Sequence, residues 1–369
     1  MRGKKILLAG HADGLGGSQT AFWQLYHFLQ KEDYSVRVIA LTDNANSLPI
    51  KKGELIGQIA HRKSAIPLTV RKAFDVAKAS IKARLFQPDI FISVGLNNSV
   101  NHISRLLAKK CFTIGQDFIA DRKLDDPLWH SSRAVMKGVA VQAPAMLDHW
   151  QQSETTFEGI NWLPCFPEPP IIGVSRTKQP VTDDEKIKLA YFGRLADNKG
   201  LPLVLRALTQ PELSNVVFDI WGKGAEEAHL RQIVSELGLE KNVHFLGGYP
   251  AAKEGAELMA SYNALILCST HCEGLPLILV EAMAYGLPFL TTNVGAIRDC
   301  CIGNTDAIMV EPTQVEISSG LVTLIGKLYS NKFDSERLRN YYDTTFSYPV
   351  MAARWNECLQ NPTAFFYGA

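Results

Sequence analysis

The amino-acid sequence predicts an α/β protein built from two doubly wound parallel-sheet domains, and three observations support this fold class. A chain of 369 residues is too long for one hydrophobic core and fits two domains of ordinary size. Short apolar runs alternate with helix-patterned stretches in both halves, as is typical of parallel sheets covered by helices. Between the halves, residues 164–173 are rich in proline, a composition typical of a linker.

The first half contains five apolar runs that are short enough to be buried strands. These expected strands are Ile6–Ala9, Val36–Leu41, Asp89–Val94, Cys111–Ile114 and Val139–Val141. Thr20–Leu29 and Ser99–Ala108 have helical spacing, whereas Thr42–Pro67 shows no clear period and its structure stays open. We expect residues 1–167 to form the first, Rossmann-like domain.

The second half repeats this pattern after a linker that is expected at residues 168–185. Its expected strands are Lys188–Phe192, Val216–Trp221, Val243–Leu246, Ala264–Cys268 and Pro288–Thr291. Its expected helices lie near Leu201–Leu208, Glu226–Leu237, Lys253–Ala260 and Leu277–Tyr285. We expect this second Rossmann-like domain to cover residues 186–345.

The composition, with 46% hydrophobic and 20% charged residues, describes a soluble globular protein. The apolar run before His11 is too short for a signal sequence, and no stretch approaches the ~20 apolar residues of a membrane span. The 7 cysteines are odd in number and irregularly placed, which favours reduced thiols and a cytoplasmic location. Cys268, His271 and Cys272 form a single cluster, for which we expect packing and not metal binding.

The net charge of +1 hides an asymmetry between the two halves. Residues 1–165 hold 21 Lys and Arg against 14 Asp and Glu, whereas the rest of the chain holds 17 against 23. A basic first half indicates either an anionic partner or an ordinary solvated face, and both interpretations stay open. The sequence has no nucleic-acid-binding motif and no aromatic residues interleaved with the basic ones, so we do not expect nucleic acid as a partner.

The stretch Thr69–Phe86 predicts a basic amphipathic helix. Its single apolar stripe consists of Val70, Phe74, Ala77, Ile81 and Leu85. Basic residues cover much of the rest, namely Arg71, Lys72, Lys78, Lys82 and Arg84. Such a helix either packs its stripe on the domain's own sheet or lies on an anionic membrane surface. The same basic surface is expected to include Lys109, Lys110, Arg122 and Lys123.

Two carboxylates in the second half are the most informative polar residues of the chain. Glu273 and Glu281 lie on either side of a loop and the start of a helix, where Pro276 suits the first helical position. The backbone amides expected to point out of the helix N-terminus belong to Gly274, Leu275 and Leu277. Such an anion site beside a carboxylate suits a ligand that carries both phosphate and a vicinal diol, such as a nucleotide sugar.

Two cations follow an expected strand of the same domain. Gly193 and Arg194 come directly after this strand, and Lys199 precedes the next helix. Open α/β sheets bind ligands beyond the carboxyl ends of their strands, so we expect both cations to converge on one phosphate group. In the first half, Gly14-x-Gly16-Gly17 follows its strand in the same way, although a glycine loop alone is a weak signal.

Five segments of the chain resemble motifs of one known enzyme family, and they have the order and the spacing that the motifs have in that family. They are Gly16-Gly17-Ser18, Tyr191–Gly200, Trp221–Gly224, His244–Tyr249 and the Glu-x7-Glu run Glu273–Glu281. Together they resemble the motifs of the retaining glycosyltransferases of family 4, and the resemblance covers nearly the whole chain. It implies the GT-B fold, in which two Rossmann-like domains face across a cleft. It also implies that the last helix, Tyr348–Leu359 within residues 346–369, crosses back to the N-terminal domain.

The resemblance assigns roles residue by residue. It implies that Arg194 and Lys199 bind the diphosphate, that Glu273 holds the donor sugar, and that Glu281 binds the ribose hydroxyls. Further donor contacts are implied for Gly16, Gly17, Gln116, Gly274, Leu275, Pro276 and Leu277. The nucleotide base region is implied at Gly222, Gly224 and Tyr249. No metal and no cofactor is implied, because GT-B enzymes generally stabilise the leaving diphosphate with protein groups.

The chain departs from the family after the strand Cys111–Ile114. Many members carry a His-Asp pair there, whereas this chain has Gln116 before Asp117. Glutamine donates and accepts hydrogen bonds but cannot transfer a proton. Retention is usually described as attack on the same face that the diphosphate leaves, with the leaving phosphate taking the acceptor's proton. Such a mechanism tolerates glutamine at this position.

The resemblance implies a retaining, metal-independent, hexosyltransferase-type enzyme that moves a sugar from a UDP- or GDP-linked donor to an alcohol acceptor. The acceptor is expected to be a saccharide of lipopolysaccharide, exopolysaccharide or a glycolipid, bound by the N-terminal domain. The enzyme would work in the cytoplasm or as a peripheral protein on the inner face of the membrane. Two alternatives stay open: a GT-B enzyme of another reaction, such as an epimerase, and a catalytically silent nucleotide-sugar-binding or scaffold protein.

Overall fold

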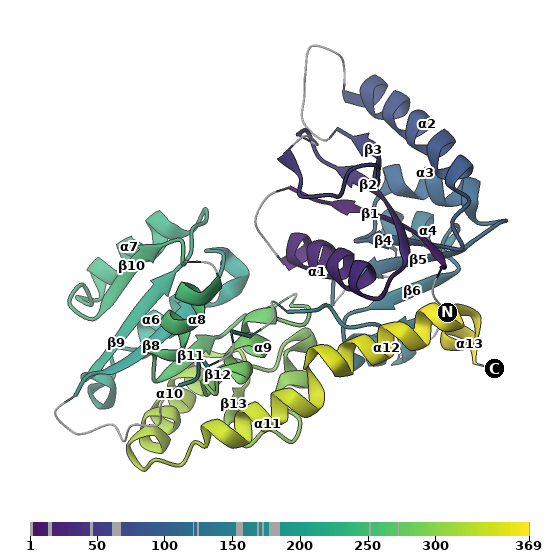
Figure 1. The fold of residues 1–369 in the computed structure, drawn as a ribbon. Helices are drawn as coiled ribbons and strands as arrows, with labels where there is room; N and C mark the ends of the chain where they lie inside the picture. The colour runs from purple at the N-terminus through teal and green to yellow at the C-terminus, as the bar shows by residue number, and fades with distance from the viewer. Residues whose placement is uncertain are drawn as a thin grey trace. The chain divides into compact units, whose positions relative to one another are not determined.

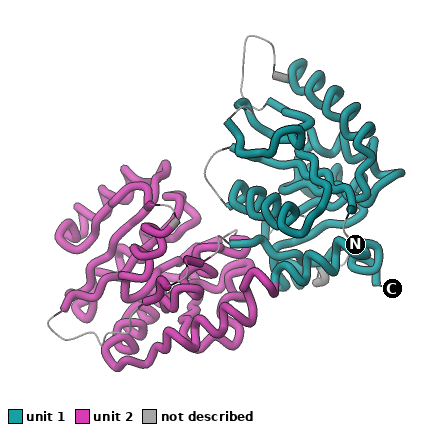
Figure 2. Tube along the Cα trace, viewed as in Figure 1, with its two compact units in different colours: residues 1–168, 351–369 teal, residues 169–350 magenta. Residues whose placement is uncertain are grey.

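The chain folds into two compact units (Figure 2). Unit 1 contains residues 1–168 and 351–369, and unit 2 contains residues 169–350. The computed structural model describes residues 3–13, 17–44, 47–60, 68–120, 122–123, 125–152, 158–167, 170–171, 173–176, 185–250, 252–271 and 273–368. The predicted linker at residues 168–185 falls largely outside this range, so its limits stay a prediction.

Unit 1 is built around a parallel sheet of seven strands in the order β3-β2-β1-β4-β5-β6-β7 (Figure 1). The strands are β1 (Lys5–His11), β2 (Ser35–Leu41), β3 (Leu55–Ile59), β4 (Ile90–Val94), β5 (Phe112–Asp117), β6 (Gly138–Val141) and β7 (Ile160–Trp162). The central strands β1 and β4 are almost entirely buried, as their continuous apolar sequence requires when helices cover both faces.

The helices of unit 1 cover both faces of this sheet. They are α1 (Gly17–Lys31), α2 (Leu68–Phe86), α3 (Asn98–Leu107), α4 (Pro127–Arg133) and α5 (Pro144–Gln152). Leu7 and Ala9 of β1 belong to the hydrophobic core formed with α2 and α3, whereas Gly10 faces Phe22 of α1. Helix α1 begins at Gly17, three residues earlier than predicted. The doubly wound arrangement predicted for the first half is therefore confirmed.

Unit 2 contains a second parallel sheet, with six strands in the order β10-β9-β8-β11-β12-β13. The strands are β8 (Ile187–Phe192), β9 (Val216–Trp221), β10 (Val243–Gly247), β11 (Ala264–Leu267), β12 (Phe289–Thr292) and β13 (Ala307–Val310). The helices are α6 (Leu201–Ala207), α7 (Glu227–Glu236), α8 (Ala252–Ala260), α9 (Leu277–Ala284), α10 (Gln314–Tyr329) and α11 (Ser335–Thr345), with 3-10 turns η2 (Asp197–Lys199), η3 (Pro211–Leu213) and η4 (Gly295–Cys300). The predicted fold class is thus confirmed for both halves.

The end of the chain returns to unit 1. Helix α12 (Tyr348–Gln360) starts in unit 2, and its later part belongs to unit 1 together with α13 (Pro362–Tyr367). The buried Trp355 indole donates a hydrogen bond to the Pro164 carbonyl, 2.8 Å away. The Arg354 guanidinium lies 3.8 Å from the Trp162 ring centroid. These contacts confirm that the last helix crosses back to the N-terminal domain.

Helix α2 corrects one interpretation of the sequence. Its inward face consists of Val76, Ala79, Ala83 and Phe86, which join the hydrophobic core of unit 1. The predicted apolar stripe is instead exposed, so it does not pack on the domain's own sheet. Arg122 is also buried and does not belong to an exposed basic surface, whereas Lys109, Lys110 and Lys123 are exposed. Among the described helices, none is long and apolar enough to cross a membrane.

Candidate active site

Glycines allow the loops after the strands of unit 2 to approach one another closely. The Gly193 amide donates to the Trp221 carbonyl at 2.9 Å, and the Gly222 amide donates to the Gly247 carbonyl at 2.6 Å. A Cβ atom on Gly222 would lie 1.7 Å from the Gly193 carbonyl oxygen, a distance that no side chain tolerates. The carboxyl ends of β8, β9 and β10 therefore form one continuous backbone surface, where open α/β sheets bind ligands.

Lys199 and Glu273 meet beside this surface. The Lys199 ammonium lies 2.6 Å from a Glu273 carboxylate oxygen, and their side chains are only 13% and 14% exposed. The turn η2 carries Lys199, and the loop before α9 carries Glu273. Lys199 thus pairs with the carboxylate that is predicted to hold the donor sugar, and its convergence with Arg194 on a phosphate group stays a prediction.

Three further contacts fix the position of Glu273. The buried Ser269 hydroxyl donates to the same carboxylate oxygen at 2.8 Å, and the Ala296 amide of η4 donates to the Glu273 carbonyl at 3.0 Å. The Thr270 amide donates to the Asn198 carbonyl at 2.8 Å, which ties this loop to the turn that carries Lys199. Ser269 was not predicted as a site residue, although it lies two residues after the end of strand β11, where open sheets bind ligands.

Helix α9 presents its N-terminus next to Glu273. It begins at Leu277, and Pro276 is its N-cap residue instead of its first helical residue, so the position predicted for this proline was wrong by one. The Leu279 amide donates to the Pro276 carbonyl at 3.0 Å, and no side chain caps the earlier amides of this first turn. Glu281 is half-buried one turn into α9, and its charge raises the pKa of Tyr342, secondarily to burial.

Arg194 is exposed directly after β8. Its carbonyl accepts a hydrogen bond from the buried Tyr191 hydroxyl at 2.7 Å, which fixes the backbone at the strand end. Within the described part of the chain, the Arg194 guanidinium forms no ion pair. It is therefore available to an anionic ligand. Burial raises the pKa of Tyr191, and the negative charge of Glu273 adds to this shift.

Aromatic rings gather at the predicted nucleotide base region. The Phe192 ring lies 5.4 Å from the Tyr249 ring and 5.8 Å from the Tyr262 ring, both edge to face. The Trp221 indole donates to the Tyr262 hydroxyl at 2.7 Å, and that hydroxyl donates to Asp219 at 2.9 Å. Tyr249 remains 46% exposed, so its ring offers an apolar surface to a ligand beside Gly222.

The predicted donor residues of unit 1 are only partly described. Gly16 lies outside the described residues, whereas Gly17 is exposed at the start of α1. Gln116 is 2% exposed at the end of β5, and its Oε1 atom is buried without a hydrogen-bond partner. Buried polar atoms are nearly always paired, so an unpaired amide oxygen indicates a site that a ligand or water completes.

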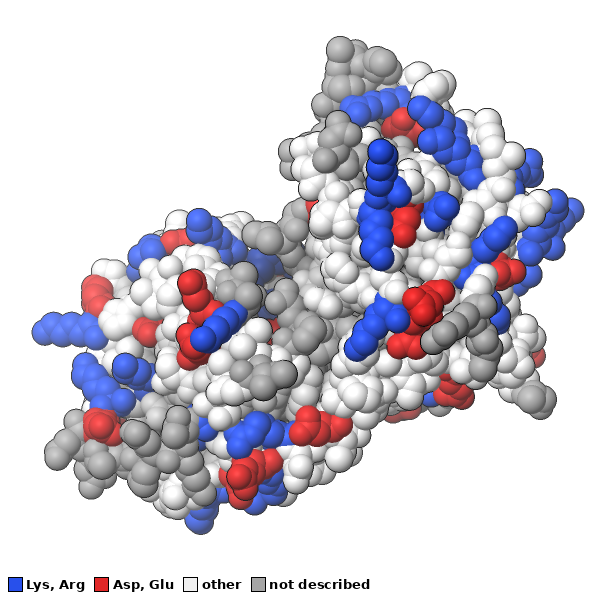
Figure 3. All heavy atoms as spheres, viewed as in Figure 1, with Lys and Arg blue, Asp and Glu red and all other residues white. Residues whose placement is uncertain are grey.

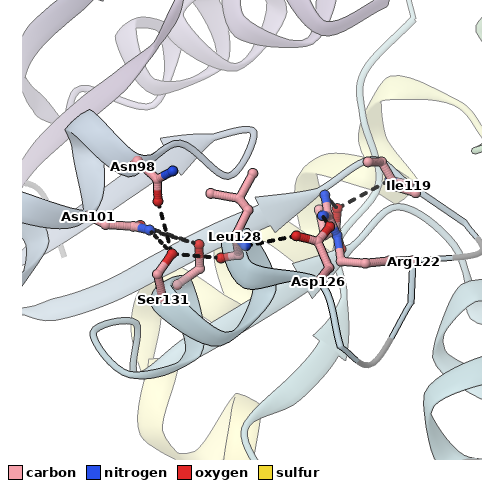
Figure 4. Close-up of polar contacts among 9 residues, drawn as sticks. Asn98, Asn101, Ile119, Arg122, Asp126, Leu128 and Ser131 are labelled. Carbon is pink, nitrogen blue, oxygen red and sulfur yellow. Dashed lines mark hydrogen bonds and ion pairs between the residues drawn. The ribbon is translucent and has the colours of Figure 1, made fainter. Parts of the chain in front are cut away.

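A buried ion-pair network follows Gln116 in unit 1 (Figure 4). Asp117 accepts two hydrogen bonds from Arg122, at 2.5 and 2.8 Å, and Arg122 also pairs with Asp126. Asp126 caps α4 by accepting from the Leu128 amide at 2.7 Å. Burial lowers the pKa of Arg122, but the hydrogen bond and charge of Asp117 outweigh it and raise the pKa overall. This network holds the loop after β5 beside a pocket of ≈ 420 Å³ lined partly by Ile119 and Lys123.

The packing role expected for the cysteine cluster stays a prediction, because the structure describes only part of the cluster. Cys268 is buried, and burial raises the pKa of its thiol to about 12, which disfavours the thiolate that a metal ion requires. Cys272 lies outside the described residues. Among the described His, Cys, Asp and Glu side chains, no group of three could hold a metal ion.

Two parallel-sheet Rossmann-like domains and a final helix that returns to the first domain define the GT-B class of folds. The sequence of residues 175–343, which make up most of unit 2, matches the family Glycosyl transferases group 1. An uncharacterized glycosyltransferase of Methanocaldococcus jannaschii is 30% identical over 133 residues. That match covers 36% of this chain and only 33% of the relative's length.

Solved structures share the fold over almost the whole chain. The lipopolysaccharide outer core galactosyltransferase WaaB superposes with a TM-score of 0.71 at 18% identity, covering 97% of this chain and 99% of that one. The Anabaena protein HepE in complex with UDP-glucose gives a TM-score of 0.74 at 16% identity, covering 96% of this chain and 99% of that one. At such low identities the likeness establishes the fold alone.

Proposed function

We propose that this protein is a retaining glycosyltransferase that moves a sugar from a nucleoside-diphosphate sugar to an alcohol acceptor. The observation that carries the proposal is the Lys199–Glu273 pair beside the glycine-lined strand ends of unit 2. A cation, a carboxylate and a helix N-terminus lie together there, and these three groups match the diphosphate and sugar of such a donor. The family match in unit 2 and the UDP-glucose bound to HepE support the same assignment.

The chemistry of transfer explains why these groups are needed. Breaking the bond between the anomeric carbon and the diphosphate places negative charge on the leaving phosphate oxygen. Lys199, Arg194 and the first-turn amides of α9 would stabilise that charge more in the transition state than in the bound donor. We propose metal-independent transfer because these fixed protein groups supply the positive charge. Glu281 would bind the ribose hydroxyls.

The ion pair gives each of these two charged groups a partner. Lys199 and Glu273 neutralise each other at 2.6 Å, so neither charge is left unpaired in a largely buried position. A diphosphate would compete for Lys199, and donor hydroxyls would then take the place of the ammonium at Glu273. We propose that this exchange of partners couples sugar binding to diphosphate binding.

The acceptor is proposed to bind unit 1, in the loops at the carboxyl ends of β4 and β5. The pocket beside Arg122 and Asp126 lies there, and its polar lining suits a saccharide. A saccharide of lipopolysaccharide, exopolysaccharide or a glycolipid is the proposed acceptor class, in keeping with WaaB, which is a lipopolysaccharide outer core galactosyltransferase. The protein would act in the cytoplasm, at the inner face of the membrane.

Nucleotide binding in solution tests the proposal. In a thermal-shift panel of UDP, GDP, ADP, dTDP and CMP, one diphosphate should raise the unfolding temperature of the protein equally with and without magnesium. At a hundredfold excess over Kd, a ligand adds about 2.7 kcal/mol to the free energy of unfolding. The matching nucleotide sugar should then be transferred with its anomeric configuration kept, as NMR of the first product would show. A shift that requires magnesium, or an inverted product, would contradict the proposal.

Ser269 offers a test of how Glu273 is positioned. Replacing Ser269 with alanine removes the hydroxyl that holds the carboxylate at 2.8 Å, and kcat of transfer should fall about tenfold. KM for the donor should change little, because Lys199 still pairs with Glu273. Ser261 is exposed at the end of α8 and provides the matched control, Ser261→Ala, which should leave kcat unchanged. Equal kcat in both variants would remove the positioning role of Ser269.

A further inference from the structure

The outward face of α2 is apolar. Val70, Phe74, Ile81 and Leu85 are 59%, 69%, 63% and 79% exposed, and Ala77 between them is exposed too. These residues follow one another at the spacing of one helical turn, so they form a continuous stripe about 22 Å long. Globular proteins rarely expose such a contiguous apolar surface unless it binds a partner or a membrane.

The other side of α2 already has its packing partner. Ala79 and Ala83 are 1% and 0% exposed in the core of unit 1, and Val76 and Phe86 pack against that core. The Phe86 ring also lies 5.2 Å from the Arg37 guanidinium. Since successive residues turn by about 100° around a helix, the exposed stripe lies opposite this inward face. The fully buried apolar residues of α2 are therefore small, whereas four bulky apolar side chains face outward.

Positive charge borders the stripe. By the helical period, Arg71, Lys78 and Lys82 lie along one edge and Arg84 along the other. The single acidic residue of α2 is Asp75, whose carboxylate accepts a hydrogen bond from the Ala60 amide at 3.2 Å, away from the stripe. Lys and Arg side chains also gather along the margin of unit 1 that α2 occupies (Figure 3).

We propose that α2 docks unit 1 on a lipid bilayer that contains anionic lipids. The stripe would enter the boundary between head groups and acyl chains, and the flanking ammonium and guanidinium groups would contact lipid phosphates. A second copy of the chain fits this face poorly. Helix α2 has five basic residues and one acidic residue, so two copies of it would repel each other. The inference deepens the proposed function, since it brings the acceptor-binding unit to a surface where lipid-linked saccharides reside.

Vesicle co-sedimentation of the full chain without substrates tests the docking. The wild type should sediment with mixed phosphatidylcholine–phosphatidylglycerol vesicles in low salt, and not with phosphatidylcholine alone. High salt should release it, because the contacts to lipid phosphates are screened. Phe74→Ser combined with Leu85→Ser should weaken binding about a hundredfold, as two large side chains lose their transfer into the bilayer. Lys78→Gln combined with Lys82→Gln should weaken it about tenfold.

Unit 2 provides a matched control for these variants. Ile302 and Val315 are 66% and 75% exposed, so Ile302→Ser combined with Val315→Ser removes similar apolar surface elsewhere. This control should bind vesicles like the wild type. Equal binding to neutral and anionic vesicles, or equal loss in the control and in the α2 variants, would overturn the proposal. If the wild type formed a dimer and bound no vesicles, and only the α2 variants were monomeric, the face would be assigned to a second copy of the chain.

The nucleotide thermal shift separates this inference from the proposed function. The α2 variants change residues outside the donor site, so the shift caused by the matching diphosphate should be the same as in the wild type. Vesicle binding without any nucleotide shift would leave the docking surface standing and remove the proposed activity. A nucleotide shift without vesicle binding would do the reverse.

Discussion

Replacing Lys199 with alanine should lower kcat of sugar transfer by about 10²–10³-fold, the usual effect of removing one group that stabilises developing charge. Lys199 is 13% exposed and holds its ammonium 2.6 Å from Glu273, so its charge is fixed before the donor binds. Because the leaving diphosphate gains charge only as its bond breaks, kcat should fall more than KM rises. Steady-state kinetics with the donor named by the thermal-shift panel would measure both.

Two further variants make the Lys199 result specific. Lys241 is exposed in the same unit, and Lys241→Ala should keep full kcat. Lys199→Arg should recover part of the activity, because it restores a cation near Glu273. If Lys199→Ala were as active as Lys241→Ala, Lys199 would not stabilise the diphosphate. We expect the Lys199→Ala variant to fold, because Glu273 keeps its hydrogen bond from Ser269. Circular dichroism would verify this.

The sequence predicted the strands that carry the site. These strands differ in burial and length from the strands that were not predicted. Strands such as β1 and β4 contain continuous apolar runs, because helices cover both faces of a central parallel strand. The edge strand β3 contains Gly57 and is only half-buried over most of its length, so it left no clear period in the sequence. The edge strand β7 has three residues, too few for any period.

Helix α2 shows where periodicity stops being informative. The spacing of its apolar residues correctly predicted a helix and one stripe. The inward face is made of Ala79 and Ala83, whose small side chains let α2 approach the core closely but give a weak hydrophobic signal. Which of two faces meets the core depends on the space that the neighbouring elements leave. The sequence of the helix alone therefore could not decide between packing and exposure.

The candidate site was predicted as a set of residues more accurately than as a set of contacts. Lys199, Glu273 and the start of α9 lie close together, as their motifs indicated. The direct Lys199–Glu273 pair was not predicted, because a motif indicates which residues contact a ligand. It does not indicate which contacts these residues make with one another. The Asp117–Arg122–Asp126 network was missed for another reason. Arg122 was interpreted as part of an exposed basic surface, whereas its burial is set by the path of the loop after β5.

Replacing Gly200 with alanine should lower the free energy of unfolding of unit 2 by about 4 kcal/mol and abolish activity. Gly200 adopts a φ of 63° between η2 and α6, and a Cβ atom there would lie 1.9 Å from the Cys268 carbonyl oxygen. This oxygen belongs to the backbone next to the site, so relief of the clash must move either Lys199 or the loop that begins with Ser269. Thermal and urea unfolding would measure the loss.

Gly238 separates the clash from the backbone strain. It has nearly the same φ, 67°, but a Cβ atom on it would have no heavy atom within 4 Å. Gly238→Ala should therefore cost only the left-handed strain of about 1–2 kcal/mol and leave kcat unchanged. The difference between the two variants in the free energy of unfolding is then the cost of the clash between one methyl group and the Cys268 carbonyl oxygen. Equal destabilisation of both variants would show that this junction yields easily, and the close approach of the two loops would then not explain the glycine at position 200.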